Sequence, residues 1–218
     1  MGDTITIKRP DGEEVAGYCA SAGDNAPGMV VIQEWWGVND QIRGVADKLA
    51  GLGYTSVVPD LYRGKVTVEA EEASHLMQNL DFANANTDVC SAVEQLKQSC
   101  PKVGVIGFCM GGALTVLAAV YSKADAACCW YGVPPPEAAD TTTIPMPFQG
   151  HFALEDGFFT PDKVDVLEAS LKEGNVTHEI YRYQAQHAFG NETGAAYNAD
   201  AANLAWERST EFLAKYLR

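Results

Sequence analysis

The sequence has little positive charge and lacks the residue spacing of metal-binding motifs. Its 218 residues include 15 lysines and arginines against 29 aspartates and glutamates, a formal net charge of −14. Nucleic acids and anionic membranes bind basic surfaces, so neither is an expected partner. No two of the four histidines are spaced i, i+4, and the six cysteines form no C-x-x-C pair, so no metal site is expected. We expect no cofactor either.

Long apolar runs and a secretory signal are also missing. No apolar stretch is long enough to span a bilayer, and the first residues lead directly into an alternating strand pattern. Cysteines without a secretory context are expected to be free thiols, which predicts a cytoplasmic protein. With 47% hydrophobic residues, the chain can bury a sizeable core, and residues 1–218 are predicted to form a single domain.

Strand-like and helix-like segments alternate along most of the chain. The predicted strands are 4–9, 15–20, 28–33, 54–58, 102–106, 126–131, 147–154 and 177–183, and the predicted helices are 39–52, 68–80, 84–99, 110–121, 161–173 and 198–217. The turn Pro10-Asp11-Gly12 between the first two strands is typical of a hairpin. The later alternation predicts a mainly parallel, twisted α/β sheet with helices on both faces, whose functional residues follow the carboxyl ends of strands.

The segment 103–114 has the pattern of a nucleophile elbow, in which a strand turns sharply into a helix. An apolar run ends in Gly107-Phe108-Cys109-Met110-Gly111-Gly112 and is followed by an apolar helical segment. The glycines would let the strand and the helix approach closely. The helix start would lower the pKa of Cys109, and the N–H of Met110 would face a substrate carbonyl. The alternative is a buried cysteine in a glycine-rich turn.

Four polar residues follow the ends of predicted strands, namely Glu34, Cys109, Asp156 and His187. The order cysteine, aspartate, histidine matches the order of nucleophile, acid and histidine in α/β-hydrolases. A thiolate can attack a carbonyl, an imidazole can transfer the protons, and a carboxylate can orient the imidazole. Alone, the histidine could be a surface residue and the aspartate part of a turn, but the joint pattern favours catalysis.

Six segments of the chain resemble the dienelactone hydrolase (carboxymethylenebutenolidase) family, and together they cover nearly its whole length. They are Gln33–Asn39, Pro59–Tyr62, Gly107–Gly112, Trp130–Val133, Glu155–Phe158 and Gln186–Phe189. The resemblance implies a three-layer α/β-hydrolase fold without a cap domain, present as a monomer or weak homodimer. It also implies that Cys109 is the nucleophile, His187 the base and Asp156 the residue that orients it.

The same resemblance implies that Glu34 hydrogen-bonds the resting thiol until substrate displaces it. A carboxylate after the apolar run 29–32 needs a partner in any case, and a salt bridge to an arginine is the alternative. The N–H of Trp35 would be the second donor to a substrate oxyanion. Trp36 is a candidate for contact with an apolar part of the substrate, although it could simply pack in the core.

The chain departs from the family where the substrate carboxylate would be bound by two arginines. Those positions hold Asn191 and Ala70, and the possible substitutes Arg63, Lys65 and Arg182 could be ordinary surface charges. We therefore expect a thiol hydrolase of small neutral esters or lactones, with Asn191 donating a hydrogen bond to the substrate. The alternatives are an esterase for an unrelated neutral ester, a non-catalytic small-molecule-binding protein on the same fold, and a redox protein that uses Cys109.

Overall fold

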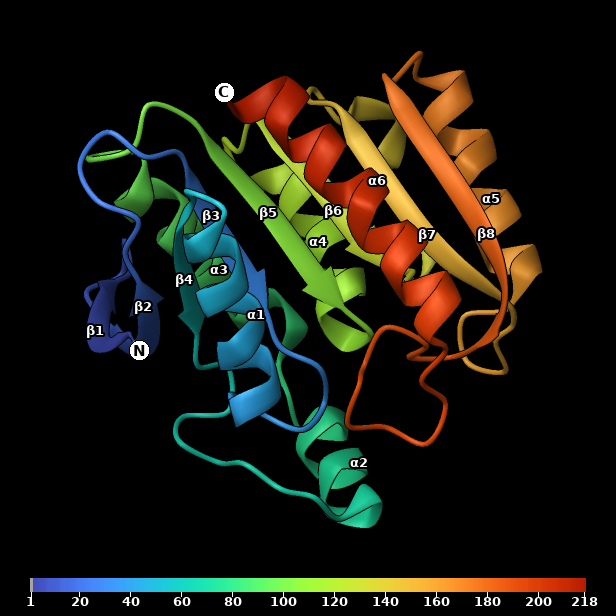
Figure 1. Ribbon diagram of the computed structural model, residues 1–218, viewed down its shortest axis with the longest axis horizontal. Coiled ribbons are helices and arrows are strands. Elements are labelled where there is room, and N and C mark those ends of the chain that lie inside the picture. Colours follow the sequence, from blue (N-terminus) through green and yellow to red (C-terminus); the bar gives the residue numbers. More distant parts are fainter. Residues whose placement is uncertain (1) are drawn as a thin grey trace.

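The computed structural model describes residues 2–218 and consists of an eight-stranded sheet with helices on both faces (Figure 1). The strands are β1 (Asp3–Lys8), β2 (Glu14–Ala20), β3 (Gly28–Ile32), β4 (Thr55–Pro59), β5 (Val103–Phe108), β6 (Ala126–Trp130), β7 (Phe148–Glu155) and β8 (His178–Gln186). The helices are α1 (Asp40–Gly51), α2 (Ala70–Gln78), α3 (Phe82–Leu96), α4 (Met110–Tyr121), α5 (Pro161–Glu173) and α6 (Ala199–Leu217). Two short 3₁₀ turns, η1 (Pro136–Ala138) and η2 (Thr141–Thr143), follow β6.

The strand order across the sheet is β1-β2-β4-β3-β5-β6-β7-β8. β2 runs antiparallel to both of its neighbours, and the strands from β4 to β8 pair in parallel. The predicted hairpin and the predicted mainly parallel sheet are thus confirmed. Parallel strands end at the same edge of a sheet, so the loops after β3, β5, β6, β7 and β8 all lie at one end of the molecule.

Helices cover both faces of the sheet, as the alternating pattern predicted. In Figure 1, α1 and α6 lie in front of the sheet, and α3 and α4 lie behind it. One core cluster contains Val89 of α3, Leu114 of α4 and Leu167 of α5, and the other contains Ile42 of α1 and Phe212 of α6. The central strands β3, β5 and β6 are buried at every residue, which explains why their sequences are continuous apolar runs.

Capping residues explain where two of the helices begin. Asn39, the first residue of the predicted helix 39–52, is the N-cap of α1, because its side chain accepts the Ile42 N–H at 3.0 Å. Helix α3 begins two residues earlier than predicted, because Asp81 accepts hydrogen bonds from the N–H groups of Ala83 and Asn84. The predicted helix 68–80 is shorter at both ends, and the 3₁₀ turns after β6 were not predicted.

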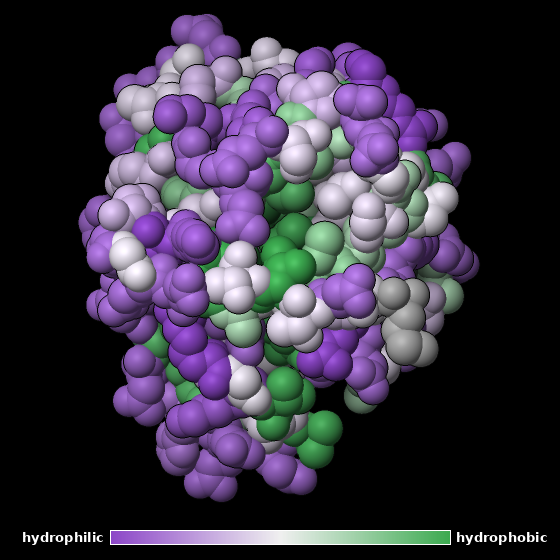
Figure 2. All heavy atoms as spheres, turned by 90° about the vertical axis from the view of Figure 1, so that its left-hand side faces the viewer, coloured by the Kyte–Doolittle hydropathy of each residue, from purple (hydrophilic) through white to green (hydrophobic). Residues whose placement is uncertain are grey.

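Helix α2 and the loop before it project beyond the sheet at the end where the parallel strands stop (Figure 1). Figure 2 shows a mostly hydrophilic face with apolar side chains near its lower end, where this segment lies. Val66 and Val68 of the loop are 49% and 86% exposed. Within residues 2–218, no helix is both long enough and apolar enough to cross a membrane.

Candidate active site

The four polar residues singled out in the sequence follow the carboxyl ends of β3, β5, β7 and β8. Cys109, Asp156 and His187 come directly after the last residue of their strands, and Glu34 comes two residues after β3. Since these strands all run in parallel, the four residues lie at one edge of the sheet. β8 extends further than predicted, to Gln186, so His187 is anchored at a strand end rather than within a long loop.

The turn between β5 and α4 has the geometry of the predicted elbow. Cys109 has φ 56° and ψ −117°, a conformation that is unfavourable for a residue with a side chain. A Cβ atom at Gly107 would overlap the Gly111 carbonyl, and one at Gly111 would lie 2.5 Å from the Gln33 carbonyl oxygen. The two glycines therefore let β5, α4 and the loop after β3 pack closely enough to hold Cys109 in this conformation.

The imidazole of His187 lies between a sulfur and a carboxylate. Its Nε2 is 3.1 Å from Sγ of Cys109, and its Nδ1 is 2.7 Å from Oδ2 of Asp156. The other carboxylate oxygen of Asp156 accepts the N–H groups of Phe158 and Phe159 at 2.8 and 2.9 Å. This arrangement fixes the orientation of the imidazole and can pass a proton to or from the sulfur.

Asp156 is ionised despite its burial, with 4% of its surface exposed. Burial by itself would raise the pKa of Asp156. The hydrogen bond and charge of His187 and the N–H groups of Phe159 and Phe158 outweigh burial, and the pKa is lower than usual. Asp156 can therefore stabilise a positive charge on His187.

The predicted lowering of the Cys109 pKa is wrong for the protein without substrate. Burial raises the pKa of the thiol, and the carboxylates of Glu34 and Asp156 raise it further. The N–H groups of Met110 and Trp35 act in the opposite direction but are outweighed. The sequence pattern indicated a helix start, but it did not indicate that the sulfur would be buried and exposed to the charges of two carboxylates.

Two backbone N–H groups from different parts of the chain face the Cys109 sulfur. One belongs to Met110, the first residue of α4, and the other to Trp35, in the loop after β3. Both stabilise negative charge at this position, because each lowers the pKa of the thiol. A carbonyl oxygen that becomes negative beside the sulfur can be stabilised by the same pair of donors.

Glu34 is buried, with 4% exposure, and its partners are neutral. Its Oε2 accepts the side-chain amide of Asn191 at 2.7 Å, and its Oε1 accepts the hydroxyl of Tyr131 at 3.2 Å. Burial raises the pKa of Glu34, while these two hydrogen bonds and the charge of His187 lower it by less. Among residues 2–218, the expected hydrogen bond between Glu34 and the Cys109 thiol is not formed, and neither is the alternative salt bridge to an arginine.

Tyr131 was not predicted to take part in the site. It follows β6 directly and has φ 38°, an unusual conformation for a tyrosine. Burial raises its pKa far above the usual range, and the charge of Glu34 adds to this effect, so its hydroxyl stays protonated and donates. The sequence did contain a signal for Tyr131, because this residue follows a buried strand and belongs to Trp130–Val133, one of the segments that resemble the family.

Asn191 does not have the geometry expected of a substrate-binding residue. Its side chain is 3% exposed, and its amide nitrogen is used by Glu34. Its Oδ1 accepts both the N–H and the hydroxyl of Thr193, at 3.0 and 2.7 Å. The side chain therefore holds Glu34 and the loop after β8 in place rather than facing an open site.

The cations considered as substitutes for the missing arginines have other partners or lie at the surface. Arg63 binds Asp88 at 2.8 Å, and Arg182 binds Asp165 at 2.6 Å. Lys65 is exposed in the loop before α2. Across residues 2–218, no three histidine, cysteine or acidic side chains are grouped so that they could hold a metal ion.

Aromatic side chains surround the reacting groups. Trp35 and Trp36 are half-buried, with their rings 5.1 Å apart in a T-shaped arrangement. The rings of Phe158 and Phe159 lie 5.2 and 5.6 Å from the His187 ring, and Phe158 is 64% exposed. The site is thus bordered by apolar rings on two sides. Among residues 2–218, His187 is the one basic side chain that pairs with Asp156, and Glu34 pairs with none.

Comparisons with known proteins agree with this geometry. The sequence model of the dienelactone hydrolase family matches residues 15–217. Carboxymethylenebutenolidase of Pseudomonas putida is 30% identical, with 98% of this chain and 97% of that protein covered. The crystal structure of a protein described as "Putative Dienelactone Hydrolase", from Klebsiella pneumoniae, is 26% identical with a TM-score of 0.89, and 99% of each chain is covered.

A more distant structure supports the fold alone. The esterase Pf2001 of Pyrococcus furiosus is 15% identical and superposes with a TM-score of 0.71 over 100% of this chain and 94% of its own. The predicted three-layer α/β-hydrolase architecture is confirmed by these neighbours together with the sheet order. The chain belongs to the dienelactone hydrolase family and is a hydrolase of esters or lactones.

Proposed function

We propose that Cys109, His187 and Asp156 form a catalytic triad that hydrolyses small neutral esters or lactones, and that residues 1–218 act as one catalytic domain. The observation that carries the proposal is the position of the His187 ring, 3.1 Å from the Cys109 sulfur and 2.7 Å from Asp156. One nitrogen can take the thiol proton while the other keeps its hydrogen bond to the carboxylate.

The first half of the reaction forms a thioester. His187 accepts the proton of the Cys109 thiol through Nε2, and the sulfur attacks the carbonyl carbon of the substrate. The carbonyl oxygen becomes negative and is stabilised by the N–H groups of Met110 and Trp35. When the C–O bond breaks, the alcohol oxygen takes the proton from His187 and leaves, or remains attached as the open end of a lactone.

The second half of the reaction releases the acid. His187 accepts a proton from a water molecule, and the resulting hydroxide attacks the thioester carbonyl. The same two N–H groups stabilise the second tetrahedral intermediate. When the C–S bond breaks, the proton returns from His187 to the sulfur, and the thiol is restored.

Glu34 acts on the thiol through its charge in this proposal. The charge of Glu34 raises the pKa of Cys109 and so favours a protonated sulfur while no substrate is bound. Its hydrogen bonds to Asn191 and Tyr131 hold it in place beside the sulfur. A protonated thiol reacts slowly with oxidants and alkylating agents, so this arrangement protects the nucleophile between turnovers.

The charges around the site favour a neutral substrate. The charges of two carboxylates, Glu34 and Asp156, act on the Cys109 sulfur, and the net charge of the chain is −14. Arg63 and Arg182 are held in ion pairs with acidic residues. The half-buried Trp35 and Trp36 provide apolar surface beside the nucleophile. In this proposal, the Trp36 ring contacts an apolar part of the substrate.

Hydrolysis of p-nitrophenyl acetate, measured with and without iodoacetamide, tests the proposal. The wild-type protein should hydrolyse this ester and lose activity on alkylation, and Cys109→Ala should be inactive. Cys19→Ala is the control, since Cys19 is a free and partly accessible cysteine that lies on β2. That variant should hydrolyse the ester and should still be inhibited. Activity that survives in Cys109→Ala would contradict the proposal.

A further inference from the structure

A groove with a volume of about 900 Å³ lies between α5 and the loop that follows β6. One wall is formed by α5, mainly by Val166 and Leu167, and the other by the loop from Val133 through Pro134, Pro135 and Pro136 to Thr141. The groove is not needed for the chemical steps described above. Its lining is mostly apolar, and Val166 is 52% exposed within it.

Both walls of the groove begin at residues that adjoin the catalytic centre. Val133 follows Gly132, which packs so closely on the nucleophile that an added Cβ atom would overlap the carbonyl oxygen of Cys109. On the opposite wall, Phe159 lines the groove, donates its N–H to Asp156 and lies 5.6 Å from the His187 ring. The end of the groove at Phe159 therefore lies next to the site.

The order of the strands places the groove on the His187 side of the nucleophile. Cys109 follows β5, Trp35 follows β3 on one side, and the groove residues follow β6 and β7 on the other. His187 follows β8, beyond β7. The oxyanion donor Trp35 and the groove thus lie on opposite sides of the sulfur.

The charged groups at the rim favour an uncharged occupant. Three carboxylates border the groove, those of Glu137, Asp140 and Asp162, and the one basic group among its lining residues is Lys163. The Lys163 ammonium donates to the carbonyl oxygen of Phe158 at 2.8 Å, so it is already engaged at the end near His187. An acidic group would be repelled along most of the groove, whereas an apolar chain would bury its surface there.

We propose that this groove binds an apolar chain on the alcohol side of the ester or lactone bond. The proposal rests on the proposed function, because it takes Cys109 as nucleophile and His187 as proton donor. His187 must give its proton to the leaving oxygen, so the alcohol part of the substrate lies beside His187. A chain attached to that oxygen is directed past Phe159 into the groove, while the acyl part stays near Trp35.

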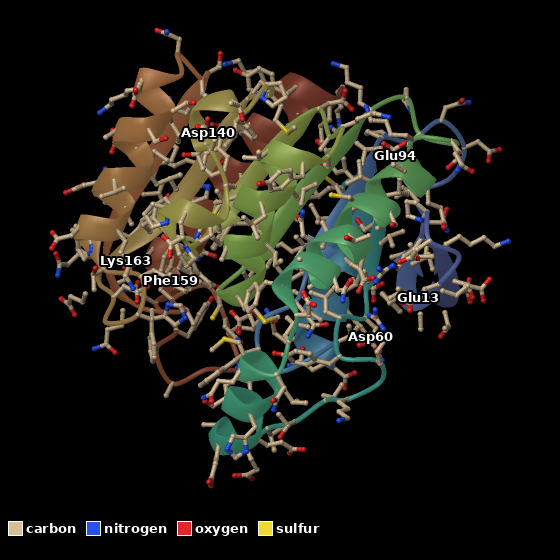
Figure 3. The ribbon with its side chains drawn as sticks, turned by 180° about the vertical axis from the view of Figure 1, so that it is seen from behind. Glu13, Asp60, Glu94, Asp140, Phe159 and Lys163 are labelled. Atoms are coloured by element: carbon tan, nitrogen blue, oxygen red, sulfur yellow. The ribbon has the colours of Figure 1, made fainter. Side chains whose placement is uncertain are left out.

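The length of the groove determines which alcohols it distinguishes. Figure 3 shows Phe159 and Lys163 near one end of α5 and Asp140 toward the other. Val166 lies five residues beyond Pro161, the first residue of α5, which corresponds to about 8 Å along the helix axis. We expect an ethyl group on the leaving oxygen to end near Phe159, and a hexyl or octyl chain to extend along α5 toward Val166.

Two ester series measured with the purified protein separate the alcohol side from the acyl side. The first series is ethyl, butyl, hexyl and octyl acetate, whose hydrolysis is measured by the acid that is released. The second is p-nitrophenyl acetate, butyrate and hexanoate. Burial of one methylene group changes a binding constant by about fourfold. We expect kcat/KM to rise at least about tenfold from ethyl to hexyl acetate and to stay within about threefold across the acyl series.

Val166→Trp is the variant that fills the groove without touching the catalytic residues. This variant should lower kcat/KM for hexyl and octyl acetate by about tenfold, which removes their advantage over ethyl acetate. It should change kcat/KM for ethyl acetate by less than about twofold. Leu204→Trp is the matched control, because Leu204 is 41% exposed on α6, which covers the other face of the sheet. This control should keep the wild-type profile.

Several outcomes would overturn the inference. A flat alcohol series in the wild type, or a gain that persists in Val166→Trp, would exclude the groove as a subsite. A chain-length gain in the acyl series that Val166→Trp removes would assign the groove to the acid part instead. If the wild type is a dimer that Val166→Trp dissociates without changing either profile, the groove is a subunit interface. Hydrolysis of these esters by Cys109→Ala would instead contradict the proposed function itself.

Discussion

The side-chain amide of Asn191 lies 2.7 Å from Oε2 of Glu34, although the two residues are 157 positions apart in the chain. The pair joins the loop after β3 to the loop after β8, on either side of Cys109. A neutral amide here leaves the buried carboxyl without a cationic partner, and burial raises its pKa. The ionisation of Glu34, and through it that of the thiol, therefore depends on neutral hydrogen-bond donors.

Removal of this amide should destabilise the fold. Asn191→Ala leaves Oε2 of Glu34 buried without its donor, which costs about 1–3 kcal/mol for an unsatisfied polar group. Urea unfolding at pH 7 measures the free energy of unfolding of both proteins. Asn203→Ala is the control, since Asn203 is exposed on α6, and it should change that free energy by less than about 0.5 kcal/mol. Equal losses in the two variants would show that the Asn191–Glu34 contact contributes nothing specific.

Substitution of the nucleophile should separate activity from folding. Cys109→Ala should lower kcat for p-nitrophenyl acetate by roughly 10⁴-fold or more and leave the circular dichroism spectrum unchanged. Cys109→Ser should keep only a small fraction of the wild-type activity, because a serine alkoxide needs a stronger base than a thiolate does. A serine variant as active as the wild type would contradict a site adapted to a thiol.

Neutralisation of Glu34 should make the thiol more reactive. The charge of Glu34 raises the pKa of Cys109, so Glu34→Gln should lower that pKa and shift the pH profile of iodoacetamide labelling toward lower pH. Labelling rates from pH 6 to 10, with mass spectrometry to locate the label, give both profiles. Glu192→Gln is the control, because Glu192 is an exposed neighbour whose charge acts on Glu34. Superimposable profiles for Glu34→Gln and the wild type would refute the electrostatic role.

Local sequence patterns were sufficient to predict most of the fold and the positions of the proposed catalytic residues. The elbow around Cys109 is encoded within six residues, and the hairpin and strand alternation are equally local. These signals placed Cys109, Asp156 and His187 at the ends of parallel strands, where the structure has them. The unpredicted start of α3 was also local, since Asp81 is a capping residue that the pattern contained.

Contacts between distant segments could not be predicted in the same way. The partners of Glu34 come from positions 131 and 191, and nothing in the run before Glu34 specifies them. The direction of the Cys109 pKa shift was predicted wrongly for the same reason. Its helix start is a local feature, whereas the burial and the two carboxylates that outweigh it depend on the tertiary structure.

Stability should fall on mild acidification because of His151, which lies under α6. His151 is fully buried, and this burial lowers its pKa to about 3. In the unfolded chain the same imidazole takes up a proton below about pH 6.5. Between about pH 6.5 and 3 the unfolded state therefore binds an extra proton, and stability is lost as pH falls. From pH 7 to 5 this single group should lower the free energy of unfolding by about 2 kcal/mol.

Urea unfolding at pH 7 and pH 5 measures this loss in matched variants. His151→Gln should be less stable at pH 7, because the ring nitrogens of His151 bond Tyr183 and Gln149. It should, however, lose about 2 kcal/mol less than the wild type between the two pH values. His75→Gln, at an exposed position on α2, should lose as much unfolding free energy between pH 7 and pH 5 as the wild type does. The role of His151 is contradicted if the free energy of unfolding falls by the same amount from pH 7 to pH 5 in all three proteins.

A negative charge on the substrate should slow its hydrolysis. A charge-assisted hydrogen bond from an arginine to a carboxylate is worth about 1.5–3 kcal/mol, so two missing arginines should cost a carboxylated lactone orders of magnitude in kcat/KM. The carboxylates of Glu34 and Asp156 add repulsion, and the amide of Asn191 is already bonded to Glu34.

A matched pair of five-membered lactones, with and without a carboxylate substituent, isolates this effect. We expect the neutral lactone to have the higher kcat/KM by at least about tenfold, with the difference shrinking as salt screens the repulsion. If the carboxylated lactone is preferred, a cation must reach the site in the complex. That cation could be Arg63 or Arg182, if either leaves its ion pair with Asp88 or Asp165. Arg63→Gln or Arg182→Gln would then lower kcat/KM for the carboxylated lactone and leave that for the neutral lactone unchanged.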